Sequence, residues 1–267
     1  MHAPPRWAEL LRSATTQPGV LNKAYSAFWN YSMGNQILAL EQCRMRGIEP
    51  GPLASYRKWQ ELGRQVRRGE KAIALWMPIT IRRPKPHEES DGDLQDNSVE
   101  FATGFVVRRN WFVLSQTEGK DFTPPSLPTW DRERALTALD IRLVSFAMID
   151  GNCQGYAQRR EIAINPVAAL PEKTMVHEIA HILLGHTGTE AMTDMPTLRR
   201  DQKEMEAESV ALLCVDSLGL PGSADARAYV QHWYGQGTEI PEMNARRIFQ
   251  AADRILKSGS FSERGAE

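Results

Sequence analysis

The segment TMVHEIAHILLGH, residues 174–186, places two histidines four positions apart with a glutamate directly after the first. On a helix, His177 and His181 lie one turn apart on one face, so both imidazoles can reach a single ion. Glu178 projects about 100° away around the helix axis and can face a water molecule on that ion. This H-E-x-x-H spacing predicts a Zn²⁺ site with His177 and His181 as ligands and Glu178 as the catalytic general base.

A catalytic zinc takes three protein ligands and keeps one open position. His186 is a tempting third ligand, but it follows the expected helix end at Gly185. The longer motif that recruits such a histidine needs glycine at 184 and histidine at 187, where the chain has Leu184 and Thr187. We therefore look for the third ligand on another helix.

The segment KEMEAESVALLC, residues 203–214, offers two glutamates on one helix face. Glu204 can bind the ion while Glu208 accepts the spare N–H of a zinc-bound histidine. The alternative is that Glu208 is itself the ligand. Glu206 is expected on a solvated acidic face.

Two helices must hold these side chains. Pro171 and Gly185 bracket the first, and the second runs from about Arg200 to Leu218 before Gly219. Other segments are expected as helices at 20–47 (one or two), 55–63, 131–139, 223–234 and 241–257, and as strands at 72–81, 99–116, 141–149 and 156–165. The strand REIAIN, 160–165, is expected either as an edge strand that pairs with an extended peptide beside the metal or as an ordinary sheet strand.

Composition points to a globular chain with two parts. The net charge is -1, and three cysteines without a C-x-x-C pair fit a reducing cytoplasm. We see neither a signal peptide nor an apolar run of the ~20 residues that span a bilayer. The stretch 117–130 is rich in proline, so we expect domains at 1–120 and 131–267 joined by a linker at 121–130.

Basic and aromatic residues gather in the first part, before an acidic segment at 87–98. A positive track for phosphates and flat rings for unstacked bases are what single-stranded nucleic acid requires. The alternative is that the tryptophans are core and the arginines are solvated surface. The candidate DNA-binding residues are Arg57, Lys58, Trp59, Arg64, Arg67, Arg68, Lys71, Arg108 and Arg109.

Two resemblances extend these expectations. HEIAH followed by EMEAESVA resembles the gluzincin arrangement of small bacterial zincins, which implies Glu204 as third ligand and Glu208 as the fallback. The segments YSMGNQILALEQCRMRG, YRKWQELGRQVRRGEKAIALWMPI and FVVRRNWFVLSQTEG resemble, in order and spacing, the N-terminal domain of ArdC-like antirestriction proteins. That family joins an N-terminal single-stranded-DNA-binding domain to a C-terminal zincin-like metallopeptidase domain.

The resemblance thus implies an α+β protein with two domains, an N-terminal α+β ssDNA-binding-like domain and a C-terminal zincin-like (gluzincin) domain. It implies one Zn²⁺ per chain, single-stranded DNA as a partner and a peptide or protein substrate, in a mobile-element protein that helps incoming DNA evade restriction. Two alternatives remain open: a regulatory zinc metalloprotease that acts on a protein partner without binding DNA, and a DNA-binding protein with a purely structural zinc.

Overall fold

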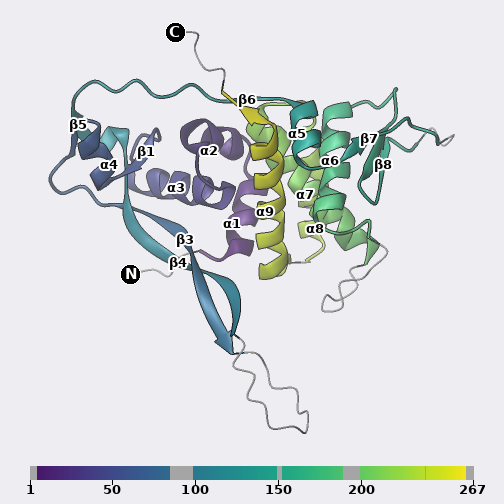
Figure 1. Cartoon of the computed structure of the whole chain (residues 1–267), viewed down its shortest axis with the longest axis horizontal. Coiled ribbons are helices and arrows are strands. Elements are labelled where there is room, and N and C mark those ends of the chain that lie inside the picture. Colours follow the sequence, from purple (N-terminus) through teal and green to yellow (C-terminus); the bar gives the residue numbers. More distant parts are fainter. Residues whose placement is uncertain (1–4, 85–98, 149–151, 189–198, 238, 263–267) are drawn as a thin grey trace, which may run out of the picture. The chain divides into compact units, whose positions relative to one another are not determined.

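The computed structural model describes residues 5–84, 99–148, 152–188, 199–237 and 239–262 (Figure 1). The acidic segment at 87–98 lies outside them. Contacts divide the chain into two compact units: unit 1 combines Met1–Pro52 with Asp121–Glu267, and unit 2 is Leu53–Lys120. The expected boundary at 120 coincides with the end of unit 2, whereas the first 52 residues pack with the C-terminal part of the chain.

Unit 1 is mainly helical. Within the described residues its helices are α1 (Trp7–Thr16), α2 (Val20–Phe28), α3 (Met33–Arg46), α5 (Arg132–Ala138), α6 (Pro171–Leu183), α7 (Arg200–Leu218), α8 (Ser223–Gly235) and α9 (Glu242–Gly259). The stretch expected to hold one or two helices at 20–47 forms two, α2 and α3, and the helices expected near 131–139, 223–234 and 241–257 are confirmed. Helix α1 was not anticipated from the sequence.

Helix α7 forms the centre of unit 1 and contacts α2, α6, α8 and α9. From Met205 to Val215 every residue is buried, including the small Ala207 and Ala211. A helix enclosed on all sides has no single apolar stripe, because each of its faces packs against another element. The packing of α7 in the core therefore fixes the positions of the glutamates on this helix.

The first helices are tied to α9 by polar contacts as well as by packing. Glu242 at the start of α9 accepts hydrogen bonds from the backbone N–H groups of Trp7 (2.8 Å) and Ala8 (3.0 Å). These N–H groups at the first turn of α1 have no partner within that helix, so the carboxylate caps it. Asp253 on α9 accepts in the same way from Met33 N, at the start of α3 (2.8 Å).

A small sheet lies against α6 in unit 1 and has the order β7-β9-β8, where β7 is Arg142–Leu143, β8 is Gly155–Gln158 and β9 is Glu161–Ile164. Strand β9 pairs in parallel with β7 and antiparallel with β8. Of the two alternatives for the 160–165 strand, the structure matches the ordinary sheet strand: β9 lies in the middle of the described sheet, and β8 and β7 are its outer strands. Two further strands, β6 (Thr129–Trp130) and β10 (Ser260–Phe261), pair antiparallel.

Unit 2 is a three-stranded sheet with a short helix and a second strand pair. Its elements are β1 (Leu53–Ser55), α4 (Tyr56–Glu61), β2 (Arg64–Val66), β3 (Ile73–Pro84), β4 (Val99–Val113), a 3-10 turn (Leu114–Gln116) and β5 (Thr117–Gly119). The sheet order is β1-β4-β3, and β2 pairs with β5. Strands β3 and β4 pair antiparallel from Ile73↔Trp111 to Pro84↔Val99, and they coincide with the strands expected at 72–81 and 99–116.

The mixed helix and strand content agrees with the expected α+β class. Among the described residues, the structure contains no helix with the length and apolar character needed to cross a membrane.

Candidate metal centre

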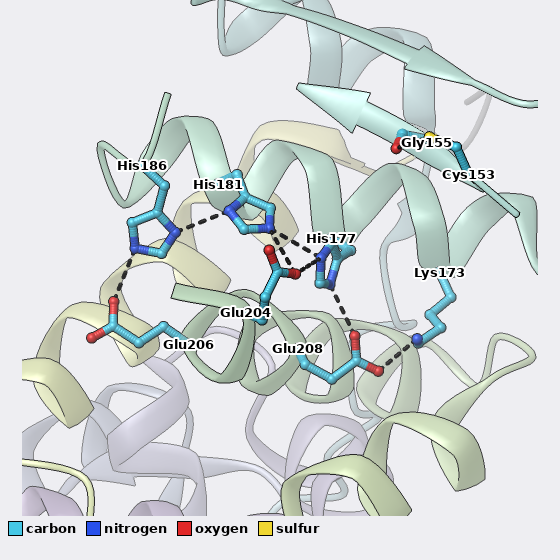
Figure 2. Close-up of polar contacts among 9 residues, drawn as sticks. All are labelled: Cys153, Gly155, Lys173, His177, His181, His186, Glu204, Glu206 and Glu208. Carbon is cyan, nitrogen blue, oxygen red and sulfur yellow. Dashed lines mark hydrogen bonds and ion pairs between the residues drawn. The ribbon is translucent and has the colours of Figure 1, made fainter. Parts of the chain in front are cut away.

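Helices α6 and α7 bring the predicted ligands together. Pro171 occupies the first turn of α6, where its missing N–H costs nothing, and Met175, Val176 and Ile179 bury one side of the helix. The periodicity that buries these apolar side chains turns His177 and His181 toward α7 (Figure 2).

Three side-chain atoms converge where the two helices meet. His177 Nε2 and His181 Nε2 lie 3.1 Å apart, and Glu204 Oε2 lies 3.3 Å from the first and 3.5 Å from the second. Donor atoms at ~2.0–2.1 Å from a tetrahedral ion lie about 3.3–3.4 Å from one another. The observed triangle has the size of one face of such a tetrahedron, so this donor set fits a zinc-sized cation. Among the described residues, His177, His181 and Glu204 are the group whose potential ligand atoms lie close enough together to hold one metal ion.

Glu208 supports His177 from behind. Its Oε2 lies 2.9 Å from His177 Nδ1, and its Oε1 lies 2.5 Å from Lys173 Nζ. A carboxylate at Nδ1 holds a proton there, which would leave Nε2 available to a cation between His177, His181 and Glu204. Of the two roles predicted for Glu208, the geometry matches the supporting one, whereas Glu204 lies beside the Nε2 atoms of both histidines.

His181 is supported differently. Its Nδ1 lies 3.0 Å from His186 Nδ1, and His186 Nε2 lies 3.1 Å from Glu206 Oε2 (Figure 2). The amide of Asn244 on α9 donates to the other oxygen of Glu206. The expectation that Glu206 is solvated is therefore wrong: its side chain is 0% exposed, because α9 and the end of α6 cover that face of α7.

Glu178 and the two ligand histidines line one cavity of about 730 Å³. Its wall also includes Tyr156 and Ala157 of β8, with Arg200 and Lys203 from the start of α7. Glu178 is nearly buried, and this burial raises the pKa of its carboxyl, an effect opposed by His177 and His181. The predicted general base thus faces the same space as the ligands.

Burial and hydrogen bonds shift the pKa values of the acidic groups and histidines at the centre. Burial lowers the pKa of His177, but its hydrogen bonds to Glu204 and Glu208 outweigh this and raise it to about 9. Hydrogen bonds to both ligand histidines hold the pKa of Glu204 far below its usual range. For Glu208, burial raises the pKa, but the hydrogen bonds from His177 and Lys173 lower it by more, so the pKa lies below its ordinary value. For His186, burial lowers the pKa more than Glu206 raises it.

The candidate DNA-binding residues all belong to unit 2, with different surroundings. Arg57 and Lys58 are exposed beside Glu61, while Arg68, Lys71, Arg108 and Arg109 are also exposed. Arg64 spans β2 and β5 through Thr117, and Arg67 donates to Ser115 O and Glu70. These last two side chains join neighbouring segments of unit 2.

The prediction that Trp59 contacts DNA is wrong. Its side chain is 1% exposed and its Nε1 donates to Phe112 O at 2.7 Å, so it belongs to the core of unit 2 and offers no ring to a base. Tyr56, three residues earlier, is the exposed aromatic: 38% of it is accessible, and its ring packs edge-on against Phe112. The i, i+3 offset put these two rings on neighbouring positions, and sequence alone did not tell which faces inward.

Comparisons with known proteins give one family model and similar proteins. Residues 6–107 match the model for the N-terminal domain of anti-restriction factor ArdC. This matched segment runs through the N-terminal helices of unit 1 and most of unit 2. An uncharacterized protein, y4eC, of Sinorhizobium fredii is 26% identical over 91% of this chain and 79% of its own length.

Two solved structures are similar to the chain. The metal-free crystal structure of the antirestriction ArdC protein from the R388 plasmid is 20% identical, with a TM-score of 0.54 over 95% of this chain and 94% of that one, which shows a shared fold. The Mn(II)-bound crystal structure of that ArdC protein is also 20% identical, with a TM-score of 0.49 over 93% and 95% of the two chains. Residues 6–107 thus match a domain of the anti-restriction factor ArdC, and the chain shares the fold of the R388 ArdC protein.

Proposed function

We propose that this chain is an antirestriction-type protein that carries a zinc-dependent peptidase centre on α6 and α7 and binds single-stranded DNA through unit 2. The observation that carries the first part is the triangle of His177, His181 and Glu204, with Glu178 facing the same cavity. The R388 protein is named as an antirestriction protein, and the proposal extends that activity to this chain.

Three protein ligands beside a cavity support a catalytic role over a structural one. Structural zinc sites are closed by four protein ligands, whereas catalytic sites keep a position open. Here the described ligand set is two imidazoles and one carboxylate, and it lines a cavity of about 730 Å³. Zinc bound there would supply Lewis acidity, acidifying a water molecule and polarising a carbonyl group.

The protein groups supply the proton transfers and the orientation. Glu178 takes a proton from the attacking water and then delivers it to the leaving amine, a role helped by a carboxyl pKa above its ordinary value. Glu208 and Lys173 hold His177 in the tautomer whose Nε2 is free. The proposed reaction is hydrolysis of a peptide bond in a peptide or protein substrate.

Replacing Glu178 by Gln tests the peptidase proposal. We expect Glu178→Gln to lower kcat by ~10²–10⁴, the usual contribution of general acid–base catalysis, on a mixed library of fluorogenic peptides. Zinc content, measured by atomic absorption, should stay at one per chain because Glu178 is not a ligand. As a control, His181→Ala should lose both zinc and hydrolysis. Hydrolysis by Glu178→Gln at the wild-type rate would contradict the assignment.

The exposed cations of unit 2 support the DNA-binding part. Arg68, Lys71, Arg108 and Arg109 are exposed, and Tyr56 adds an accessible ring. Cations that follow a backbone and a ring that stacks on bases are the usual means of holding a single strand. These exposed groups favour the proposal over a protease that recognises only protein.

A quadruple variant tests DNA binding. We expect Arg68→Gln, Lys71→Gln, Arg108→Gln and Arg109→Gln together to weaken binding of a labelled mixed-sequence single strand, measured by fluorescence anisotropy. Each cation–phosphate interaction that the variant removes should reduce the log–log salt slope by ~0.7. The matched control replaces four exposed cations of unit 1 in the same way, namely Lys23, Arg132, Arg134 and Arg254. An equal decrease in affinity in both variants, or wild-type affinity no higher than for duplex DNA, would refute the proposal.

A further inference from the structure

The end of α6 has a backbone turn that places His186 directly over His181. Leu184 is the helix cap, Gly185 has a left-handed φ of 75°, and His186 follows. The His186 N–H donates to His181 O at 2.8 Å, and the Gly185 N–H donates to Ile182 O at 3.1 Å. This pair of bonds is the Schellman motif, which glycine allows because it has no Cβ to oppose the left-handed conformation. The residue after the glycine is thereby folded back onto the ligand-bearing turn.

The side chains of His181, His186 and Glu206 form a chain of hydrogen bonds that determines which ring nitrogen carries each N–H. A carboxylate only accepts, so the contact between Glu206 Oε2 and His186 Nε2 puts the single N–H of a neutral His186 on Nε2. His186 Nδ1 then holds a lone pair and accepts from His181 Nδ1, 3.0 Å away. With its proton on Nδ1, His181 would present the lone pair of Nε2 to a metal bound beside His177 and Glu204.

The carboxylate at the far end is itself fixed from a third helix. Glu206 is fully buried, and Asn244 of α9 donates to its second oxygen. Arg247, one turn further along α9, donates to the carbonyl of Leu184 at the cap of α6. Burying a carboxylate is costly unless hydrogen bonds compensate for the hydration it gives up, so a structural role alone would be served equally well by an apolar side chain.

We propose that His186 and Glu206 are positioning residues that fix the tautomer and ring orientation of His181 and thereby strengthen metal binding. This inference rests on the proposed metal centre. It makes the two ligand histidines unequal: His177 is supported directly by Glu208, whereas His181 is supported through a second imidazole. His186, which is not a ligand, thus acts on the metal through His181.

Three variants of the full chain test the proposal. Zinc affinity is measured by competition with a chelating dye, and the geometry of the site by the visible spectrum of the Co²⁺-loaded protein. We expect His186→Leu, which removes the acceptor for His181, to weaken zinc binding by ~10–100-fold, as losing a group behind a ligand histidine typically does. His186→Asn keeps an acceptor oxygen near the position of Nδ1, so its affinity and Co²⁺ spectrum should stay close to wild type. Glu206→Gln preserves volume but removes the charge, and its affinity should fall between these two.

A merely structural His186 gives a different result. His186→Leu and His186→Asn would then lower the unfolding temperature of the metal-free protein alike, and the folded variants would bind zinc as tightly as wild type; that result overturns the proposal. If His186→Leu does not fold, as judged by near-UV circular dichroism, Glu206→Gln decides in its place, and wild-type zinc affinity in that variant overturns the proposal.

The controls separate this inference from the proposed function. If His181→Ala abolishes zinc binding and His186→Leu leaves it unchanged, only the positioning role fails. If the wild-type chain binds no zinc, or binds it equally well in His181→Ala, the metal centre itself fails and the positioning role fails with it.

Discussion

Four glutamates on α6 and α7 have different neighbours, which suit them to the four tasks that we propose for them. Glu204 faces both ligand imidazoles, whose hydrogen bonds keep its carboxyl charged. Glu208 is held between His177 and a lysine. Burial raises the pKa of Glu178, which suits a group that exchanges protons. Glu206, fully enclosed, holds the far end of a hydrogen-bonded chain. The proposed roles of ligand, support and base thus differ because the surroundings of these glutamates differ.

A fifth carboxylate, Asp253, illustrates the cost of such burial. Burial raises its pKa to about 6, an effect reduced by Lys257 and by the hydrogen bond from Met33 N. Between the unfolded pKa of 3.8 and about 6, the folded state binds the proton more tightly than the unfolded state. Stability therefore falls as pH rises through this window, and the full penalty is present above it.

We expect Asp253→Asn to be more stable than wild type at pH 7.5, by up to ~2–3 kcal/mol, because a shift of about two pKa units corresponds to that free energy. The amide oxygen can still accept the bond from Met33 N. The advantage should shrink below about pH 6 and vanish only well below the unfolded pKa of 3.8, where aspartate is protonated in both states. Urea unfolding at a series of pH values measures it. The exposed Asp121→Asn serves as control, and an advantage for Asp253→Asn that does not vary with pH would argue against this account.

At the scale of elements, the helices of the site were predictable and the strands only in part. Helices α6 and α7 carry local signals: Pro171 at the start of one, Gly185 and Gly219 past the ends, and H-E-x-x-H between. Strands β8 and β9 have four residues each, and so short a run does not encode its neighbours. Their order depends on β7, which pairs with β9 in parallel from a distance in sequence.

His186 and Glu206 show what the spacing of residues does not reveal. The position of Gly185 marked the helix end, and a histidine next to it should have suggested a turn that returns to His181. Glu206 was misplaced because its exposure depends on α9, a helix far along the chain that supplies Asn244. Periodicity assigns side chains to faces of a helix, but the element that covers each face is a property of the tertiary structure.

At the scale of the whole chain, sequence and contacts divide the molecule differently. Unit 2 ends at Lys120, within the proline-rich stretch 117–130. The other end lies at Pro52, because α1, α2 and α3 pack with α7, α8 and α9 in unit 1. An apolar helix face in the sequence does not say which helix it meets. The match to the ArdC N-terminal domain covers residues 6–107, so one family domain contributes to both units.

We expect metal binding to stabilise unit 1 as a whole. The proposed ligands come from both α6 and α7, and α7 is the centre of that unit. An unfolded chain does not hold these three groups together, so zinc binds the folded state and shifts the equilibrium toward it. At a free zinc concentration 100-fold above Kd, the expected gain is ~2.7 kcal/mol. For a unit of this size, that gain corresponds to a rise in Tm of about 5–10 °C.

Differential scanning calorimetry of the full chain, with zinc and after removal of zinc by a chelator, measures this shift. The transition of unit 1 should move while that of unit 2 stays in place, because the proposed ligands all lie in unit 1. His177→Ala combined with His181→Ala should abolish the shift, since one carboxylate cannot hold the ion alone. A shift of equal size in this double variant would place the metal elsewhere. A wild-type transition that zinc leaves unmoved would mean that α6 and α7 do not share a metal in the folded chain.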